Sequence, residues 1–398
     1  MATNILDNID MSRLGKLLQQ ARKKCGMTQA EAAKVINAAR TTIVAIEKGE
    51  RRLKATELIK LARAYGRTIS DFVHKPQQIV QPFEVQFRAA YRRNEAEIAK
   101  IESTISSLQE FCQKYLELEE IMDTPLPRNY PPEYEVRNMP IEAAAESIAL
   151  CERQRLGLGD APIARLRDVL EQSVGLRIFY LKMPPKYSEM YNYDEKLGGC
   201  MAINVNHPEE RRRWSLAHGF LHFLAHRRKA AIDVDGQYKR LPESEQLAEA
   251  FPKYFLMPTS SLLKRFNDLY RSHERFTPTN LFTLAYYYGV SVEALTYRLE
   301  EIKLLPSGTW ERLCDRGLKV RKVQEELGLQ GIPQRNDTTP IHYQHLAIEA
   351  LDRGLITEGR FADFLGVDRL EARRIAETLH EHSSGTIEES DRLDLSQA

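Results

Sequence analysis

The stretch Trp214-Ser-Leu-Ala-His218-Gly219-Phe-Leu-His222-Phe-Leu-Ala-His226 predicts a buried helix, because it is almost wholly apolar apart from histidines at every fourth position. His218 and His222 lie one helical turn apart, so their rings can reach one metal ion from the same face. His226 lies about 12 Å along the helix from His218, which is too far to share that ion. A lone histidine on an apolar face is usually a core residue, whereas this pair marks a candidate metal site.

A general base is missing from this candidate site. In the metallopeptidase signature H-E-x-x-H, the glutamate after the first histidine accepts a proton from zinc-bound water. Gly219 occupies that position here. Glycine offers no proton acceptor, so the sequence predicts no catalytic residue and only a vestigial metal site at His218 and His222. A zinc ion held by two imidazoles alone would be bound weakly, because catalytic zinc sites use three protein ligands.

Segments on both sides of the histidines carry a family resemblance. A strand-like run ends at Asn206 ahead of the helix, and the runs Ala250-Phe-Pro-Lys-Tyr-Phe-Leu-Met-Pro258 and Gly289-Val-Ser-Val-Glu-Ala-Leu295 follow it. In this order and spacing, residues 140–305 resemble the ImmA/IrrE metallopeptidases. The resemblance implies a zincin-like domain with a small β-sheet, and a glutamate on the later helix as the third zinc ligand. Active members of this family are regulatory proteases that cleave transcriptional repressors.

The third-ligand position implied by the resemblance is Leu247, which cannot bind zinc. Glu245 and Glu249 lie two residues to either side of it, about 200° round the helix, so we expect them to point elsewhere. Glu243 lies on the expected face but one turn away. Glu243, or a carboxylate from the polar and aromatic loop expected at residues 187–199, is therefore the alternative that would complete a metal site.

Residues 1–75 predict a small DNA-binding domain of five short helices. This segment holds 15 Lys or Arg and 7 Asp or Glu, whereas the whole chain has a net charge of only +1. A basic domain on an acidic remainder indicates a polyanionic partner. Thr28 and Glu31 are spaced as a helix capping box, and Ala39 stands where a serine usually caps the next helix. The segment resembles the Xre-type helix-turn-helix, with matching residues at Gln29, Ala33, Ile43, Glu47 and Gly49.

The resemblance implies which residues contact double-stranded DNA. The helix that begins at Arg40 is expected to lie in the major groove, where Arg40, Thr41 and Thr42 reach base edges. Thr28 and Gln29 begin the preceding helix and are expected to contact phosphate. The basic loop after the recognition helix adds further expected phosphate contacts at Lys48, Arg51 and Arg52.

The remaining chain predicts a connecting helix, the peptidase-like domain and a helical C-terminal region. Residues 80–124 form the connecting helix, which either supplies a homodimer seam or packs on its own domain. Prolines then mark a linker. Inside residues 140–305, strands are expected at 176–182 and 200–206. Residues 306–382 predict a C-terminal helical domain, and residues 383–398 an acidic, disordered tail. The expected fold class is predominantly α, of α+β type.

Composition favours a cytoplasmic protein. The five cysteines are scattered and form no C-x-x-C motif, which fits a reducing compartment and argues against a cysteine-based zinc site. No apolar run reaches the roughly 18 residues of a membrane span, and no secretory signal pattern opens the chain. We therefore expect no membrane partner.

Three functions are compatible with these features. The first is a DNA-binding transcriptional regulator whose peptidase-like domain is inactive and serves in sensing or in docking a protein partner. The second is an active zinc metalloprotease that cleaves a repressor or an antitoxin. The third is an antitoxin or defence-system component that acts by protein binding. The first requires no cofactor, and the second requires zinc. The first two point to bacterial or phage gene control.

Overall fold

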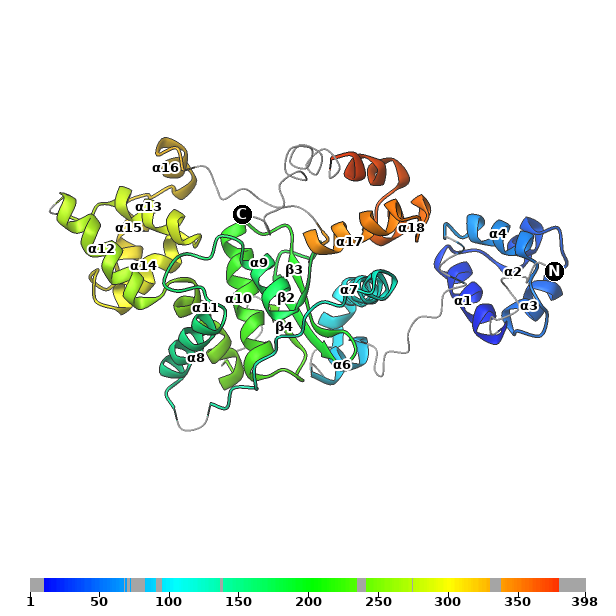
Figure 1. Cartoon of the computed structure of the whole chain (residues 1–398), viewed down its shortest axis with the longest axis horizontal. Helices are drawn as coiled ribbons and strands as arrows, with labels where there is room; N and C mark the ends of the chain where they lie inside the picture. Colours follow the sequence, from blue (N-terminus) through cyan, green and yellow to red (C-terminus); the bar gives the residue numbers. More distant parts are fainter. Residues whose placement is uncertain are drawn as a thin grey trace, which may run out of the picture. The chain divides into compact units, whose positions relative to one another are not determined.

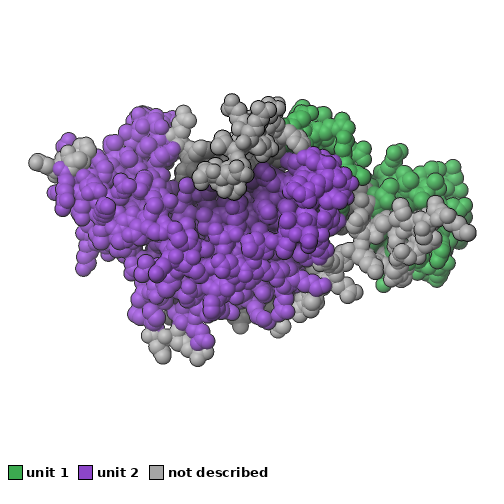
Figure 2. All heavy atoms as spheres, in the orientation of Figure 1, with its two compact units in different colours: residues 1–78, 356–398 green, residues 79–355 purple. Residues whose placement is uncertain are grey.

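The computed structural model describes residues 11–67, 69, 72, 83–90, 95–136, 139–234, 241–273, 275–329 and 338–378. The chain divides into two units, which are described separately (Figure 2). Unit 1 comprises residues 1–78 and 356–398, and unit 2 comprises residues 79–355. Helices dominate both units and the strands form one small sheet in unit 2, which confirms the predicted α, α+β class. The predicted acidic tail lies outside the described residues.

Unit 1 begins with four helices that bury one small core. These are α1 (Met11–Lys24), α2 (Gln29–Val35), α3 (Arg40–Glu47) and α4 (Ala55–Ala64), drawn in blue in Figure 1. The predicted capping box of α2 is confirmed, because Thr28 and Glu31 each accept a hydrogen bond from the other's backbone N–H. The fifth predicted helix falls mainly on residues outside the described part of the chain. The four helices share an apolar core that includes Leu14, Leu18, Ala33, Ile43, Ile46, Leu58 and Leu61.

The close contact between α1 and α3 depends on Gly15 and Glu47. A Cβ atom on Gly15 would come within 2.3 Å of the Ile46 carbonyl oxygen, so a larger residue could not approach α3 this closely. The buried Glu47 carboxylate accepts hydrogen bonds from Arg22 at 2.6 Å and from Gln29 at 2.9 Å. Burial raises the pKa of Glu47, but these donors outweigh burial and keep that pKa below its usual value. A charged carboxylate therefore joins the first three helices.

Unit 2 is built on a four-stranded sheet with the order β1-β3-β2-β4. Its strands are β1 (Arg177–Leu181), β2 (Tyr187–Asp194), β3 (Gly198–Asn204) and β4 (Ala231–Val234). β3 is parallel to β1 and antiparallel to β2, which in turn is antiparallel to β4. β1 and β3 confirm the two predicted strands. The loop predicted for residues 187–199 is wrong, because most of this segment is the buried strand β2.

Helix α10 (Glu209–Ala225) packs on β2 and β3 and carries the histidine stretch into the centre of unit 2. Gly199 of β3 permits this close packing, since a Cβ atom there would lie 3.1 Å from the Phe223 ring of α10. Asn204 orders the turn between β1 and β2. Its side-chain amide donates to the carbonyl oxygens of Tyr187 at 2.7 Å and of Pro184 at 3.2 Å. The start of β2 is thereby fixed beside α10.

The segment predicted as one connecting helix, residues 80–124, holds two helices, α6 (Phe83–Ala90) and α7 (Glu95–Met122). Helix α7 packs on β1, β3 and helix α17 (Ile341–Asp352) of the same unit. Phe111 stacks on Phe179 of β1 with ring centroids 5.2 Å apart. Arg177 of β1 donates two hydrogen bonds of 2.7 Å to the buried carboxylate of Glu119. The following apolar or aromatic residues of α7 are fully buried in this unit: Ile101, Ile105, Leu108, Cys112, Tyr115 and Leu118.

The other helices precede or follow the sheet in the chain. Those before the sheet are α8 (Ile141–Arg155), α9 (Leu166–Val169) and the π-helical turn η2 (Leu170–Val174). After β4 come α11 (Glu243–Leu256), α12 (Thr259–His273), α13 (Pro278–Tyr288), α14 (Val292–Glu301), α15 (Thr309–Asp315) and α16 (Val320–Glu326). Helix α11 packs on both α8 and α10. Helix α18 (Glu358–Leu365) belongs to unit 1. Within the described residues, the search for a helix with the length and apolarity to cross a membrane finds none.

Candidate functional site

The two predicted histidines lie together on the buried middle of α10. His218 and His222 are 2% and 1% exposed, and their ring centroids are 5.0 Å apart. Both ring nitrogens of His222 lack a hydrogen-bond partner among the described residues. Its Nε2 lies 3.4 Å from Glu245 Oε2 without a well-formed hydrogen bond, and a buried imidazole in this state is suited to an additional ligand.

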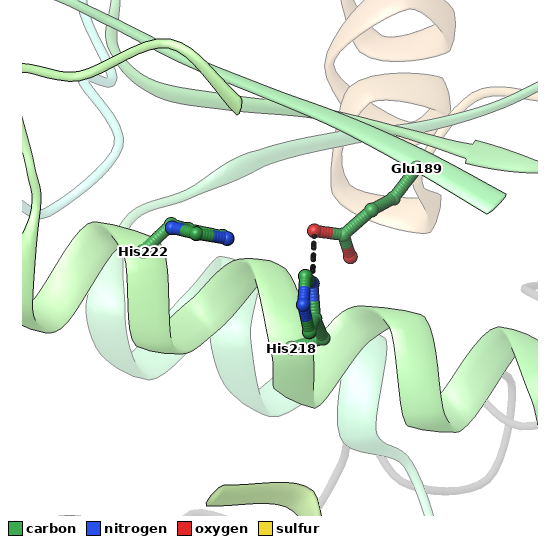
Figure 3. A group of neighbouring side chains, drawn as sticks. All are labelled: Glu189, His218 and His222. Carbon is green, nitrogen blue, oxygen red and sulfur yellow. Dashed lines mark hydrogen bonds and ion pairs between the residues drawn. The ribbon is translucent and has the colours of Figure 1, made fainter. Parts of the chain in front are cut away.

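Strand β2 supplies a carboxylate that fills the position next to Gly219. The Glu189 side chain points from β2 toward α10, beside the two histidines (Figure 3). Its two oxygens accept hydrogen bonds from His218 Nδ1 at 2.9 Å and from the backbone N–H of Gly219 at 3.0 Å. The register of β2 with β4 shifts between Tyr187 and Glu189, an irregularity of the kind that a β-bulge produces. Bulges commonly redirect a side chain beside a functional site.

Gly219 leaves room for the Glu189 carboxylate in its present position. A Cβ atom on Gly219 would lie 2.9 Å from both carboxylate oxygens of Glu189 and 2.7 Å from Cε of Met201. The glutamate of an H-E-x-x-H helix would begin at that Cβ atom, so its side chain and the Glu189 carboxylate exclude each other here. The structure thus replaces a helix-borne carboxylate with one from the sheet.

Helix α11 brings two further carboxylates to the histidines, so the prediction that Glu245 and Glu249 point elsewhere is wrong. Glu245 Oε2 lies 3.4 Å from His222 Nε2 and 3.8 Å from His218 Nε2. Glu249 Oε1 lies 3.9 Å from His218 Nε2. These glutamates are one helical turn apart and therefore share a face of α11. The matching four-residue spacing of the histidines and glutamates was the sequence signal for this contact.

Leu247 and Glu243, the two other α11 positions named in the sequence analysis, face a different cavity. Leu247 and Glu243 line a cavity of about 500 Å³ together with His226. Leu247 is 2% exposed and belongs to the apolar core. The third-ligand position inferred from the resemblance was thus two residues too late. Glu243 does not complete the histidine site, and the carboxylates that approach it come from β2 and from Glu245.

These residues fit a zinc ion. Neighbouring ligands of a tetrahedral zinc lie roughly 3.3 Å apart when metal–ligand distances are near 2.0–2.1 Å. Glu245 is close to that distance from both Nε2 atoms. Glu189 also lies within reach of the histidines, but its oxygens are already bonded to His218 and Gly219. We therefore assign Glu189 to orienting His218, since a carboxylate on the second ring nitrogen is the usual partner of a metal-binding histidine.

The charges of these groups depend on one another. Burial lowers the pKa of His218, but the Glu189 carboxylate outweighs burial and raises that pKa to about 10. Burial raises the pKa of Glu189 to about 7 despite the attraction of His218. Burial lowers the pKa of His222 and raises that of Glu249. The pKa of Glu245 is shifted upward by burial, but its interaction with His222 reverses the shift and leaves that pKa below its usual value.

A cavity of about 820 Å³ lies beside the histidine site. Trp214 of α10 and Glu249 of α11 line it on the side of the histidines, and residues 291–301 of α14 and its cap line it opposite. A ligand in this cavity would therefore contact Glu249, whose carboxylate lies 3.9 Å from His218 Nε2.

The expected base-reading residues lie at the start of α3. Arg40 and Thr41 are exposed and Thr42 is half-buried. Ala39 makes no side-chain cap, and its backbone carbonyl accepts from the Thr42 N–H at 2.9 Å. Free N–H groups at a helix start attract phosphate or base acceptors.

The expected phosphate contacts divide into two groups. Lys48 and Arg52 are exposed, whereas Arg51 is half-buried and forms an ion pair of 3.0 Å with Glu57. The N–H of Thr28 donates to Glu31, and one amide hydrogen of Gln29 is directed to Glu47. We therefore expect the following backbone N–H groups and the second amide hydrogen of Gln29 to donate to a phosphate at the start of α2.

Fold and site together define a helix-turn-helix unit joined to an α+β domain with a histidine pair on a buried helix. Residues 18–72 match the helix-turn-helix family, and residues 171–300 match the IrrE N-terminal-like domain of Peptidase M78. The predicted fusion of an Xre-like domain with an IrrE-like, metallopeptidase-like domain is confirmed. No curated protein matches the chain.

Among solved structures, the crystal structure of ComR from Streptococcus suis aligns with 93% of this chain and 96% of that chain, at 10% sequence identity. The TM-score of 0.16 establishes no shared fold.

Proposed function

We propose that this chain is a DNA-binding transcriptional regulator that reads its operator with α3. The helix-turn-helix match, the excess of basic residues in residues 1–75 and the exposed start of α3 support this function. Helix-turn-helix proteins commonly bind two half-sites as dimers, so we also propose a homodimer. The apolar face of α7 is buried in its own unit, and the dimer contact therefore lies on another surface.

We further propose that the IrrE-like domain binds a metal ion and a protein partner without cutting peptide bonds. The observation that supports this most directly is the Glu189 carboxylate at Gly219, with both oxygens bonded. A general base must reach the proton that it removes, within hydrogen-bonding distance. Glu189 is 1% exposed and bonded to His218 and the backbone, so it holds the histidine and is not available for that task.

Zinc is the metal that the site suits. His218, His222 and Glu245 would hold it, and zinc would polarise an oxygen atom bound in its open position. Glu189 would fix the orientation of His218, and the two imidazoles and one carboxylate would leave a net positive charge. The metal would then serve to bind a carbonyl or carboxylate of a partner, which is a sensing or docking role.

An active protease is the second candidate, and Glu249 is the residue that favours it. Its side chain is 46% exposed, lies 3.9 Å from His218 Nε2 and lines the large cavity. A carboxylate in this position can accept a proton where Gly219 cannot. Peptide cleavage by the wild-type chain that requires Glu249 would therefore replace the non-cutting proposal.

The DNA proposal predicts two classes of variant. Arg40→Ala combined with Thr42→Ala should abolish the preference for operator over random DNA, because these side chains read bases. Lys48→Ala or Arg52→Ala should weaken all duplexes alike and lower the salt slope by about one per lost contact. Equilibrium binding to the operator found by genome-wide mapping, at several salt concentrations, measures both. Lys60→Ala, which removes an exposed charge from α4, is the control. Equal losses of affinity for operator and random DNA in all variants would contradict the assignment of these residues.

The non-cutting proposal is tested by exchanging the two carboxylate positions. Glu189→Ala with Gly219→Glu restores the H-E-x-x-H pattern and removes the carboxylate that blocks its side chain. We expect zinc-bound wild type to leave a fluorogenic peptide library intact and the double variant to cleave it. Gly219→Glu alone should remain inactive because Glu189 occupies the space.

Zinc content by mass spectrometry provides a second readout. We expect one zinc per wild-type chain and much less in His222→Ala, whereas Leu247→Ala should keep it. Cleavage by wild type that stops with a chelator and in His222→Ala would contradict the non-cutting function. Repeating that measurement with Glu249→Gln would then show whether Glu249 supplies the base.

A further inference from the structure

The cavity of about 820 Å³ in unit 2 is lined by the first turns of two helices. Glu210 lies in the first turn of α10, and Glu293 lies in the first turn of α14. Neither carboxylate forms a hydrogen bond or ion pair with another residue that the structure describes. Carboxylates in a first helical turn interact favourably with the helix dipole.

The other charges of the cavity leave it negative. Five carboxylates and three cationic side chains line it. Lys253 is paired with Glu142 at 3.0 Å, and Arg298 is paired with Glu301 at 3.1 Å. Arg211, the remaining cation, donates to the neutral Ser188 hydroxyl at 3.0 Å.

Glu249 is the fifth carboxylate and faces both the cavity and His218. Negative charge therefore collects along Glu210 and Glu293, which have no such partner among the described residues, and Glu249, which faces His218. Low-dielectric walls focus such a field and favour a cationic ligand.

Aromatic and apolar groups line the same cavity. Trp214 is half-buried on α10, and Tyr297 of α14 is 44% exposed although it is a large aromatic residue. Pro208 and Ala294 add apolar surface. Aromatic faces attract ammonium and guanidinium groups and also pack against aliphatic stems. A volume of about 820 Å³ is within the range of roughly 300–1,000 Å³ found for ligand pockets.

We propose that this cavity is the docking site for an extended peptide segment of a partner protein, which presents a lysine or arginine next to an apolar side chain. The basic group would lie between Glu210 and Glu293, and the apolar side chain against Trp214 and Tyr297. A peptide is favoured over a free amine because the cavity combines unpaired carboxylates with exposed aromatic surface. This inference rests on the proposed function, since it names the partner class of the IrrE-like domain.

The test uses the full-length chain and two capped tetrapeptides. Acetyl-Ala-Lys-Phe-Ala-amide and acetyl-Ala-Glu-Phe-Ala-amide differ only in one charged residue, and isothermal titration calorimetry gives their Kd values. We expect the lysine peptide to bind at least about tenfold more tightly. The double variant Glu210→Gln, Glu293→Gln should remove that preference. Spermidine, a cation without an aromatic group, should bind about tenfold more weakly than the lysine peptide.

A charge-matched control and three outcomes decide the proposal. The double variant Glu50→Gln, Glu325→Gln removes two exposed carboxylates that do not line the cavity and should keep the preference. No binding of either peptide at millimolar concentration, equal binding of both peptides, or equal binding of spermidine would each overturn it. Circular dichroism melting checks that the cavity variants are folded, and Trp214→Leu provides a second variant that should weaken the lysine peptide.

The same samples separate this proposal from the proposed function. Operator binding is measured on every variant, and mass spectrometry shows whether the bound peptide is intact. Selective binding of an intact peptide supports both proposals. Selective binding followed by cleavage overturns the non-cutting function but keeps the docking site. Operator binding with no peptide selectivity overturns the docking site alone.

Discussion

The backbone N–H of Gly219 and the ring of His218 both donate to the Glu189 carboxylate, at 3.0 and 2.9 Å. A side chain at position 219 would collide with that carboxylate. The absence of a glutamate at position 219 and the position of the Glu189 carboxylate are therefore linked, because the two side chains would occupy the same space. The sequence shows the glycine but not its partner, because Glu189 lies on another element whose register with β4 is irregular.

Glu171 provides a pH test at the scale of one residue. Burial raises the pKa of its carboxyl from 4.5 to about 7, although Arg167 and the Tyr115 hydroxyl oppose the shift. The pKa of Glu171 is higher in the folded state than in the unfolded state. The protonated carboxyl therefore makes its full contribution to the stability of the fold below pH 4.5. That contribution is lost as the pH rises toward 7. The loss is roughly 3 kcal/mol, since one pKa unit corresponds to about 1.4 kcal/mol.

Glu171→Gln removes this titration and keeps an oxygen that can accept from Tyr115. We expect the free energy of unfolding of unit 2 to fall less between pH 4.5 and 7 in the variant than in wild type. The new amide hydrogens cost about 1–3 kcal/mol if they lack a partner. The slope of the free energy of unfolding against pH is therefore a cleaner measure than the absolute free energy of unfolding. Urea unfolding followed by tryptophan fluorescence gives this slope, and parallel profiles for the two proteins would contradict the assignment.

At the scale of elements, amphipathic helices were predictable and the central strand was not. The four-residue spacings of α10 and the capping box of α2 appear directly in the sequence and are confirmed. Strand β2 buries Glu189, Asn192 and Asp194 among its tyrosines. Polar residues at such positions resemble a loop in a single sequence.

The prediction of which α11 residues face the histidines was wrong for a different reason. An error of two residues in register rotates a helix by about 200°, which moved Glu245 out of the predicted site and Leu247 into it. The role of α7 also needed the structure, since an apolar face predicts burial but does not name the surface that buries it.

The contact of α1 with α3 gives a prediction that opposes helix propensity. Alanine is favoured over glycine inside a helix by about 1 kcal/mol. At Gly15, however, the new Cβ atom would lie 2.3 Å from a backbone oxygen of α3, and overpacking typically costs about 1–3 kcal/mol. Since rigid backbone must move, we expect Gly15→Ala to destabilise this helical core.

Hydrogen–deuterium exchange of peptides covering residues 11–50 measures the Gly15→Ala effect, with faster exchange expected. Gly359→Ala in α18 is the matched control, because its nearest neighbour would be the flexible end of Arg369 at 3.2 Å. That variant should not accelerate exchange in residues 356–378. Slower exchange around Gly15 after the substitution would mean that α1 and α3 do not approach each other this closely in solution.

At the scale of the whole molecule, charge and hydrophobic cores divide the chain in the same way. Residues 1–75 carry a net charge of +8, so the remaining residues carry −7. The core of α1 to α4 and the core around α10 consist of separate sets of residues. The proposed DNA and partner sites therefore belong to different cores, and we expect a mutation to change the stability of one core without removing the other.

Separate cores predict separate unfolding. Calorimetry of the full chain should show two transitions, and tryptophan fluorescence should follow only one, since Trp214 and Trp310 both lie in unit 2. Gly15→Ala should lower only the transition that is silent in fluorescence, by roughly 4–8 °C per kcal/mol for a domain of this size. Glu171→Gln should change the midpoint of only the transition that is seen in fluorescence. The largest change should be in the pH dependence of that midpoint. Operator DNA should raise the silent transition, because a ligand stabilises the unit that binds it. A single transition that both variants shift equally would show that the two cores unfold as one, and regulation through the IrrE-like domain would then act through global stability.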